Sequence, residues 1–79
     1  MKTLKTLEIG DKIEHYCAGE LVEAAVIERR GNSVITEHAP IRYGNDIYKN
    51  TTIMPSLPLQ MPTCETTPGA FINGKRLKL

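Results

Sequence analysis

Four side chains in this 79-residue sequence carry the groups that proteins use most often for metal binding and thiol chemistry. They are His15, Cys17, His38 and Cys64. His15 and Cys17 are two positions apart and would share one face of a strand. A structural zinc site needs about four converging ligands, usually in closely spaced pairs, and only one close pair is present. We therefore predict no metal site and no cofactor, and we expect half-buried imidazoles and small apolar thiols instead.

The same residues could pair a thiol with an imidazole for nucleophilic catalysis. However, no glycine-framed nucleophile elbow surrounds either cysteine. The sequence also lacks a phosphate-binding loop and a paired-glycine fingerprint for a dinucleotide. A polar group formed by Arg42, Tyr43 and Asp46 is explained equally well by turn residues at the rim of a barrel. We therefore expect a protein that is not an enzyme.

The length of the chain limits it to one domain with a thin core. A chain of this size buries only about 60% of the surface that it exposes when unfolded. It has one Phe, three Tyr and no Trp, so few large side chains can fill the core. Self-association or binding to a partner protein would compensate for this small core, and we expect one of the two.

Ten Lys and Arg residues against nine Asp and Glu residues give a formal net charge of +1. This balance argues against a strongly acidic DNA mimic and against a protein held on nucleic acid mainly by phosphate contacts. The N-terminus has no apolar stretch of the signal-peptide type, and no transmembrane span is evident. Two cysteines are few for a secreted chain of this length. We expect a cytoplasmic protein with reduced thiols, or a virion protein if the source is viral.

The stretch 21–37 organises the rest of the chain. It consists of two apolar runs around Gly31-Asn32-Ser33, which is typical of a β-hairpin. A helix over residues 20–30 is the alternative, because Leu, Glu, Ala and Arg form helices well and Gly31 would end it. We favour the strand because turn chemistry is the better guide for short apolar runs.

Further strands and turns surround this hairpin. Gly10-Asp11 precedes a short strand over 12–17, and Gly44-Asn45-Asp46 forms a later turn. The order of IGDKI, a glycine turn, a strand, RGN and another strand resembles small SH3-like barrels, including the KOW type, over about residues 7–50. This resemblance implies a fold but no function. We therefore predict an all-β fold, a small SH3-like barrel or β-roll, whose core is formed by residues 1–52.

The segment 53–68 contains four of the five prolines and almost no charge. Such a segment is extended and largely polyproline-like. It is more apolar than a flexible linker, so it needs a protein surface to lie on. We predict that residues 53–79 form an extended arm and a terminal hairpin at Asn73-Gly74, packed within one domain or on a partner. The predicted partner-binding residues of this arm are Met54, Leu57, Leu59 and Met61.

The function that these features favour is a non-enzymatic interaction or assembly module. A small subunit of a viral or phage-type assembly, or a small phage-encoded inhibitor that docks on a host protein, fits this description. The alternative is a small nucleic-acid-binding barrel, because basic and aromatic side chains of such barrels contact backbone and bases. The residues predicted for this alternative are Arg29, Arg30, Arg42, Tyr43, Lys75 and Arg76. Neither function predicts a membrane contact or a small-molecule substrate.

Overall fold

The computed structural model describes residues 2–55 and 65–78. The regular structure of these residues is entirely β, so they contain no helix that is long and apolar enough to cross a membrane. The strand over residues 20–30 is confirmed, and the helical alternative is wrong. Seven strands follow in chain order: β1 (Lys12–Cys17), β2 (Glu20–Arg30), β3 (Ser33–Tyr43), β4 (Asp46–Met54), β5 (Thr66–Pro68), β6 (Phe71–Ile72) and β7 (Lys75–Arg76).

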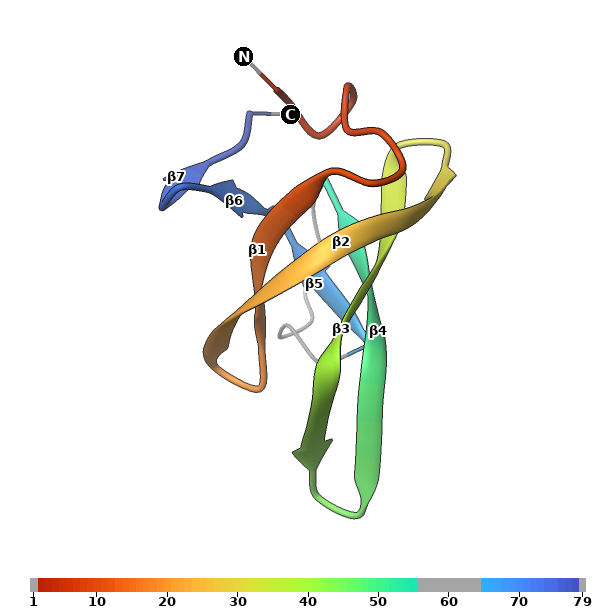
Figure 1. Cartoon of the computed structure of the whole chain (residues 1–79), viewed down its shortest axis with the longest axis vertical. Coiled ribbons are helices and arrows are strands. Elements are labelled where there is room, and N and C mark those ends of the chain that lie inside the picture. The colour runs from red at the N-terminus through yellow and green to blue at the C-terminus, as the bar shows by residue number, and fades with distance from the viewer. Residues whose placement is uncertain (1, 56–64, 79) are drawn as a thin grey trace.

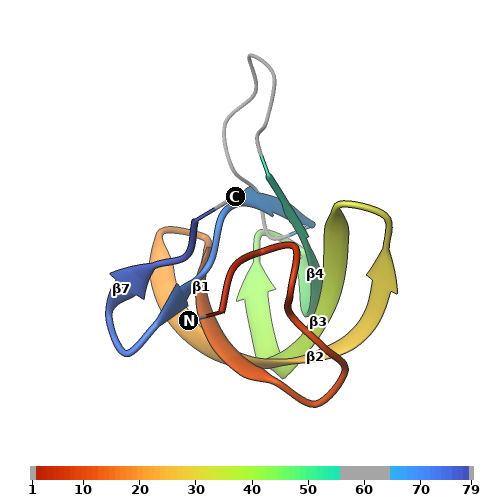
Figure 2. The ribbon, with the colours of Figure 1, turned by 90° about the horizontal axis from the view of Figure 1, so that it is seen from above.

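All seven strands belong to one sheet with the order β5-β4-β3-β2-β1-β6-β7. Strands β1 to β4 form an antiparallel meander, whereas β5 pairs with β4 in parallel. The sheet twists strongly and curls around the N-terminal segment (Figures 1 and 2). The prediction of an all-β fold is therefore confirmed as a mixed, curled sheet that forms a half-barrel, an architecture compatible with a small β-barrel.

Two of the hairpins have loops in which both residues have positive φ. Ala18 and Gly19 connect β1 to β2 with φ values of 54° and 81°, and Asn73 and Gly74 connect β6 to β7 with 52° and 79°. Two successive positive φ values are typical of the type I′ turn, whose twist matches that of the strands. Asn and Gly tolerate this conformation, whereas Ala18 adopts it at a steric cost.

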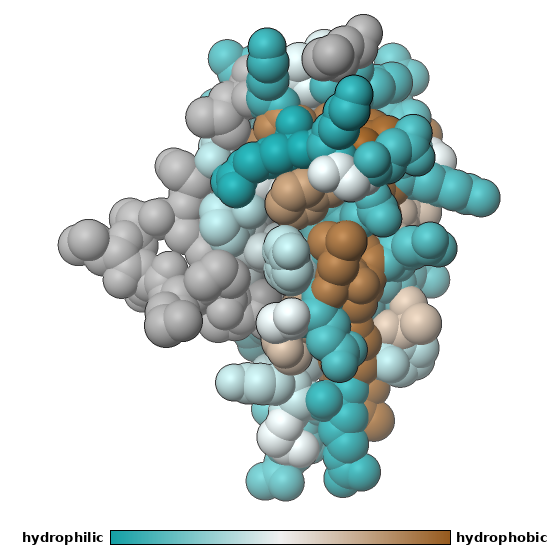
Figure 3. Space-filling view, turned by 90° about the vertical axis from the view of Figure 1, so that its left-hand side faces the viewer, coloured by the Kyte–Doolittle hydropathy of each residue, from teal (hydrophilic) through white to brown (hydrophobic). Residues whose placement is uncertain are grey.

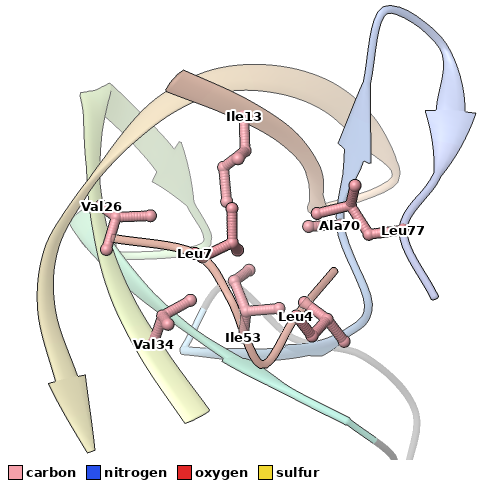
Figure 4. Packing of buried hydrophobic residues seen from close by; sticks show 8 residues of the cluster. All are labelled: Leu4, Leu7, Ile13, Val26, Val34, Ile53, Ala70 and Leu77. Atoms are coloured by element: carbon pink, nitrogen blue, oxygen red, sulfur yellow. The ribbon is translucent and has the colours of Figure 1, made fainter. Parts of the chain in front are cut away.

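The apolar core is built on the concave side of the curled sheet. Two of its members, Leu4 and Leu7, come from the N-terminal segment and lie between the strands (Figure 4). Leu7 is only 1% exposed. The N-terminal segment therefore fills the half-barrel with side chains that the sheet itself does not supply. The core consists of Leu4, Leu7, Ile13, Val26, Val34, Ile53, Ala70 and Leu77.

Backbone hydrogen bonds attach the N-terminal segment to the sheet. The amide of Gly10 donates to the carbonyl of Val26 at 2.8 Å, and the amide of Val26 donates to the carbonyl of Asp11 at 2.9 Å. At the other end, the amide of Leu4 donates to the carbonyl of Lys78 at 2.9 Å. The segment is therefore part of the half-barrel, and it lies beside the C-terminal end of the described chain.

A β-bulge changes the side on which the end of β2 presents its side chains. The register with β3 shifts between Val26 and Glu28, and Arg29 then lies opposite Val34. Val26 and Val34 are both core residues. Simple alternation places Arg29 on the face opposite to Val26, but one extra residue in a strand reverses the faces that follow it. The bulge therefore brings Arg29 to the same face as the core.

Candidate functional site

The β3–β4 hairpin extends beyond the rest of the sheet (Figure 1). Strand β2 pairs with β3 only as far as His38, and β5 pairs with β4 only at Thr52–Met54. Residues 41–48, which we call the ribbon, therefore have no third strand beside them in the described part of the chain. Tyr43 and Ile47 of the ribbon are 58% and 64% exposed. The ribbon is held by the cross-strand pairs Ile41–Tyr48, Arg42–Ile47 and Tyr43–Asp46.

Hydrophobic side chains are visible on the molecular surface near the ribbon. The space-filling view shows them between hydrophilic side chains, continuing toward the end of the molecule where the ribbon lies (Figure 3). Exposed apolar side chains that are gathered in this way are typical of protein contact sites, whereas isolated ones need no explanation. The ribbon is therefore the first candidate for a binding surface.

A second candidate is an open groove of about 710 Å³ lined by residues of β1, β2, β3, β6 and the β6–β7 turn. Three carboxylates, those of Glu14, Glu23 and Glu37, lie along it with one ammonium group, that of Lys12. Glu14 is directly opposite Glu23 in the β1–β2 pair, and like charges in this position destabilise a sheet. The excess of carboxylates favours cationic groups in the groove.

The residues predicted for nucleic-acid binding occupy separate places. Arg29 donates hydrogen bonds to the backbone carbonyls of Leu4 and Leu7, at 3.0 and 3.1 Å. Arg30 forms an ion pair with Glu28. These arginines lie at the β2–β3 turn, whereas the ribbon that carries Arg42 and Tyr43 extends from the opposite end of the molecule (Figure 1). Lys75 and Arg76 form β7, which is the edge strand farthest from β5 in the sheet. The fold does not bring these six residues together.

The residues predicted for partner binding fall largely outside the described residues. Met54 ends β4, where it is half-buried and lies beside Pro68 of β5. Leu57, Leu59 and Met61 belong to residues 56–64, which the structure does not describe. Binding of a partner by these three residues therefore stays a prediction.

The two histidines meet inside the half-barrel. His15 is fully buried and His38 is 7% exposed, and their rings pack edge to face with centroids 5.4 Å apart. Two buried threonines connect them. Nε2 of His15 lies 2.9 Å from Oγ1 of Thr36, and Nε2 of His38 lies 2.9 Å from Oγ1 of Thr51. The hydroxyl of Thr36 also donates to the carbonyl of Thr51 at 3.1 Å. We call these four residues the histidine network.

The acceptors around the network determine which nitrogen atoms carry hydrogen. Nδ1 of His38 lies 2.9 Å from the carbonyl of Ala39, so it must donate, and Nε2 then accepts from Thr51. The Thr36 hydroxyl uses its hydrogen for the Thr51 carbonyl, so Nε2 of His15 donates to Thr36. The pKa of His15 is lowered from 6.5 to about 4, mainly by burial; the hydrogen bond to the Tyr16 carbonyl opposes this shift, and the neighbouring His38 adds to it. His15 is therefore neutral at neutral pH.

Sequence reasoning identified both histidines as candidates but did not place them together. It missed Thr36 and Thr51, although Val34, Thr36 and His38 alternate along one strand and therefore share a face.

Cys17 is buried on β1, and Cys64 lies outside the described residues. The described His, Cys, Asp and Glu side chains form no cluster of three that could hold a metal ion. Comparison with known proteins adds no relative to this description: no protein-family model, curated protein or solved structure matches the chain.

Proposed function

We propose that this protein is a non-enzymatic protein-binding module and that the ribbon, residues 41–48, is its contact element. The observation that carries the proposal is the exposure of Tyr43 and Ile47 on a hairpin that extends beyond the sheet. Tyrosine in such positions supplies a large apolar contact area together with a polar hydroxyl group, which suits protein interfaces.

The energetics of the ribbon support this proposal. A two-stranded hairpin alone is at best marginally stable in water, and the ribbon gains no stability from a third strand among the described residues. Exposed apolar side chains at its tip contribute little to the stability of the isolated protein. A partner that covers Tyr43 and Ile47 would bury their apolar area, at about 25 cal/mol per Å² removed from water.

The arrangement of positive charge favours a protein partner over nucleic acid. Binding to nucleic acid depends on several cationic groups that track one phosphate backbone. Here Arg29 is bound to backbone carbonyls and Arg30 is paired with Glu28. Arg42 belongs to the ribbon, which extends away from the β2–β3 turn (Figure 1). The groove adds an excess of carboxylates close to the sheet surface.

Point substitutions in the ribbon test the proposal. A deletion of residues 53–79 would be a poor test, because it would remove the core residues Ile53, Ala70 and Leu77. We suggest the double variant Tyr43→Ser/Ile47→Ser, with Ile9→Ser as the control because Ile9 is 71% exposed and lies outside the ribbon. Binding partners are captured from a lysate of the source organism and identified by mass spectrometry, and self-association is measured by sedimentation velocity.

The unmodified protein and the Ile9→Ser variant should retain the same partner or the same oligomer. The double variant should lose at least about tenfold in affinity, since two anchoring side chains of an interface commonly contribute more than 1 kcal/mol each. Equal binding by all three proteins contradicts the proposal. Binding to mixed-sequence nucleic acid with a steep dependence on salt would support the alternative function instead.

A further inference from the structure

The histidine network lies at the root of the ribbon. The last pair between β2 and β3 joins Ala24 to His38. The pairing of β3 with β4 is irregular just beyond this point, between Glu37 and Ile41. His38 donates to the carbonyl of Ala39 within this irregular stretch. The network is thus attached to the backbone where β3 leaves the barrel.

In its neutral form, the network has fewer hydrogen atoms to donate than it has polar contacts that require one. On the His15 side there are three contacts: Nδ1 to the Tyr16 carbonyl at 3.4 Å, Nε2 to Thr36 at 2.9 Å, and Thr36 to the Thr51 carbonyl at 3.1 Å. Neutral His15 and Thr36 supply one hydrogen each. With the hydrogen of His15 on Nε2, Nδ1 and the Tyr16 carbonyl face one another as two acceptors. An additional proton on Nδ1 would satisfy the third contact.

Burial opposes the uptake of this proton while the ribbon root is closed over His15. Desolvation is the largest cause of the lowered His15 pKa, and the hydrogen bond to the Tyr16 carbonyl offsets only part of it. Cys17 of β1 and His38 of β3 are the titratable groups buried with His15, while β2 contributes Val22 and Ala24. Lys49 of β4 and Glu65, which precedes β5, are exposed. Among the described groups, His38 is the one whose charge lowers the pKa of His15.

Opening at the ribbon root would remove this obstacle. Water would reach the imidazole of His15, and the proton would no longer be buried beside His38. His15 of β1 is joined to β3 by its contact with Thr36, and His38 and Thr51 extend the network along β3 and β4. Movement of the ribbon root away from His15 would therefore admit water. Proton uptake is thereby coupled to the position of the ribbon.

We infer that the histidine network is a proton-controlled latch, which holds the ribbon root against the barrel while the His15 imidazole is neutral and releases it on acidification. The use of this release to regulate a partner rests on the proposed function of the ribbon. The release itself is a property of the isolated protein and can be measured without any partner.

The size of the effect follows from linkage. If His15 regains its ordinary pKa of 6.5 in the open state, compared with about 4 in the closed state, lowering the pH from 8 to 5 raises the opening equilibrium constant about 30-fold. Amide hydrogen exchange measures this equilibrium residue by residue. Protection factors, corrected for intrinsic exchange at each pH, should fall by about this ratio for residues 39–50. At every pH the free energy of opening of these residues should stay below that of Val26 and Val34, whose exchange reports global unfolding.

His15→Gln is the matched variant, because glutamine can still donate to Thr36 but does not titrate. In this variant the protection of residues 39–50 should no longer depend on pH between 8 and 5. If the variant does not fold, NMR titration of the imidazoles in the unmodified protein provides the second test: the ribbon amides should exchange between two states over the pH range in which the His15 imidazole titrates.

The latch is refuted if residues 39–50 have the same free energy of opening as Val26 and Val34, since the ribbon then opens only by global unfolding. It is also refuted if the pH dependence persists in His15→Gln, or if His15 titrates at its ordinary pKa while the ribbon stays protected. None of these measurements involves a binding partner. The latch could open as expected while the double variant Tyr43→Ser/Ile47→Ser still binds its partner normally. That combination would leave the latch intact and overturn only the proposed function.

Discussion

The N-terminal segment offers the sharpest test of how this half-barrel is stabilised. Leu7 and Ile9 are apolar side chains two positions apart, but Leu7 is 1% exposed and Ile9 is 71% exposed. Truncation of each to alanine therefore makes a matched pair in which the chemistry is similar and only the burial differs. We expect Leu7→Ala to destabilise the protein strongly and Ile9→Ala to leave its stability almost unchanged.

The magnitude follows from the position of Leu7 in the core. Leu7→Ala removes three buried carbon atoms, which corresponds to about 2.4 kcal/mol of transfer free energy at about 0.8 kcal/mol each. The cavity that remains in the half-barrel adds to this, and core Leu→Ala substitutions typically cost about 2–5 kcal/mol in total. We expect about 3 kcal/mol, which for a domain of this size lowers the Tm by about 15 °C. Ile9→Ala should change the free energy of unfolding by less than about 0.5 kcal/mol.

Urea denaturation at constant pH, followed by circular dichroism, measures both changes. Equal m-values for the two variants would show that the difference arises from stability and not from a change in the surface exposed on unfolding. Equal destabilisation by the two substitutions would refute the assignment of the N-terminal segment to the core. If Leu7→Ala leaves the free energy of unfolding unchanged, side chains other than Leu7 must fill the half-barrel.

Substitutions in the β1–β2 turn and at the end of β2, and a change of pH, provide three further tests. Ala18→Asn should stabilise the protein by up to about 1 kcal/mol, measured as a rise in Tm, because asparagine tolerates the positive φ of this turn better than alanine does. Arg29→Met should lower the free energy of unfolding, measured in urea, by about 2 kcal/mol, because the guanidinium binds two carbonyls of the N-terminal segment. Arg30→Met, on the exposed side of the turn, should lower it by less than about 0.5 kcal/mol. The free energy of unfolding should fall as the pH is lowered from about 6.5 toward 4, because His15 binds a proton in the unfolded chain first. The loss should approach about 2–3 kcal/mol at pH 4.5, and its absence would show that His15 is not buried in its neutral form.

Local chemistry in the sequence predicts the β-hairpins of this fold. Asn73-Gly74 and the turn after Arg30 are positions where short polar or glycine residues separate apolar runs. Helix propensity over residues 20–30 points the other way, but a strand there pairs with β1 on one side and β3 on the other. Propensity contributes only tenths of a kcal/mol per residue, so these two sets of cross-strand contacts decide the outcome.

The long-range arrangement has no comparable signal in the sequence. The parallel contact of β5 with β4 and the position of β6 beside β1 depend on how the chain returns after residue 64. The bulge after Val26 likewise carries no glycine or proline, yet it reverses the face on which Arg29 lies. For this reason an arginine that sequence reasoning assigned to a nucleic-acid surface is bonded to the N-terminal segment.

The inward face of the sheet changes character along its strands. Near the N-terminal segment it carries Val26, Val34 and Ile53, whereas nearer the ribbon β3 and β4 carry Thr36, His38 and Thr51. Apolar side chains of similar volume at the second set of positions would pack without any need for hydrogen-bond partners, and a partly satisfied polar network is less stable than an apolar core. Stability alone therefore gives no reason for two imidazoles and two hydroxyls at this place. Departures from local packing rules are expected where a protein carries out its function, and this departure lies where the exposed ribbon begins.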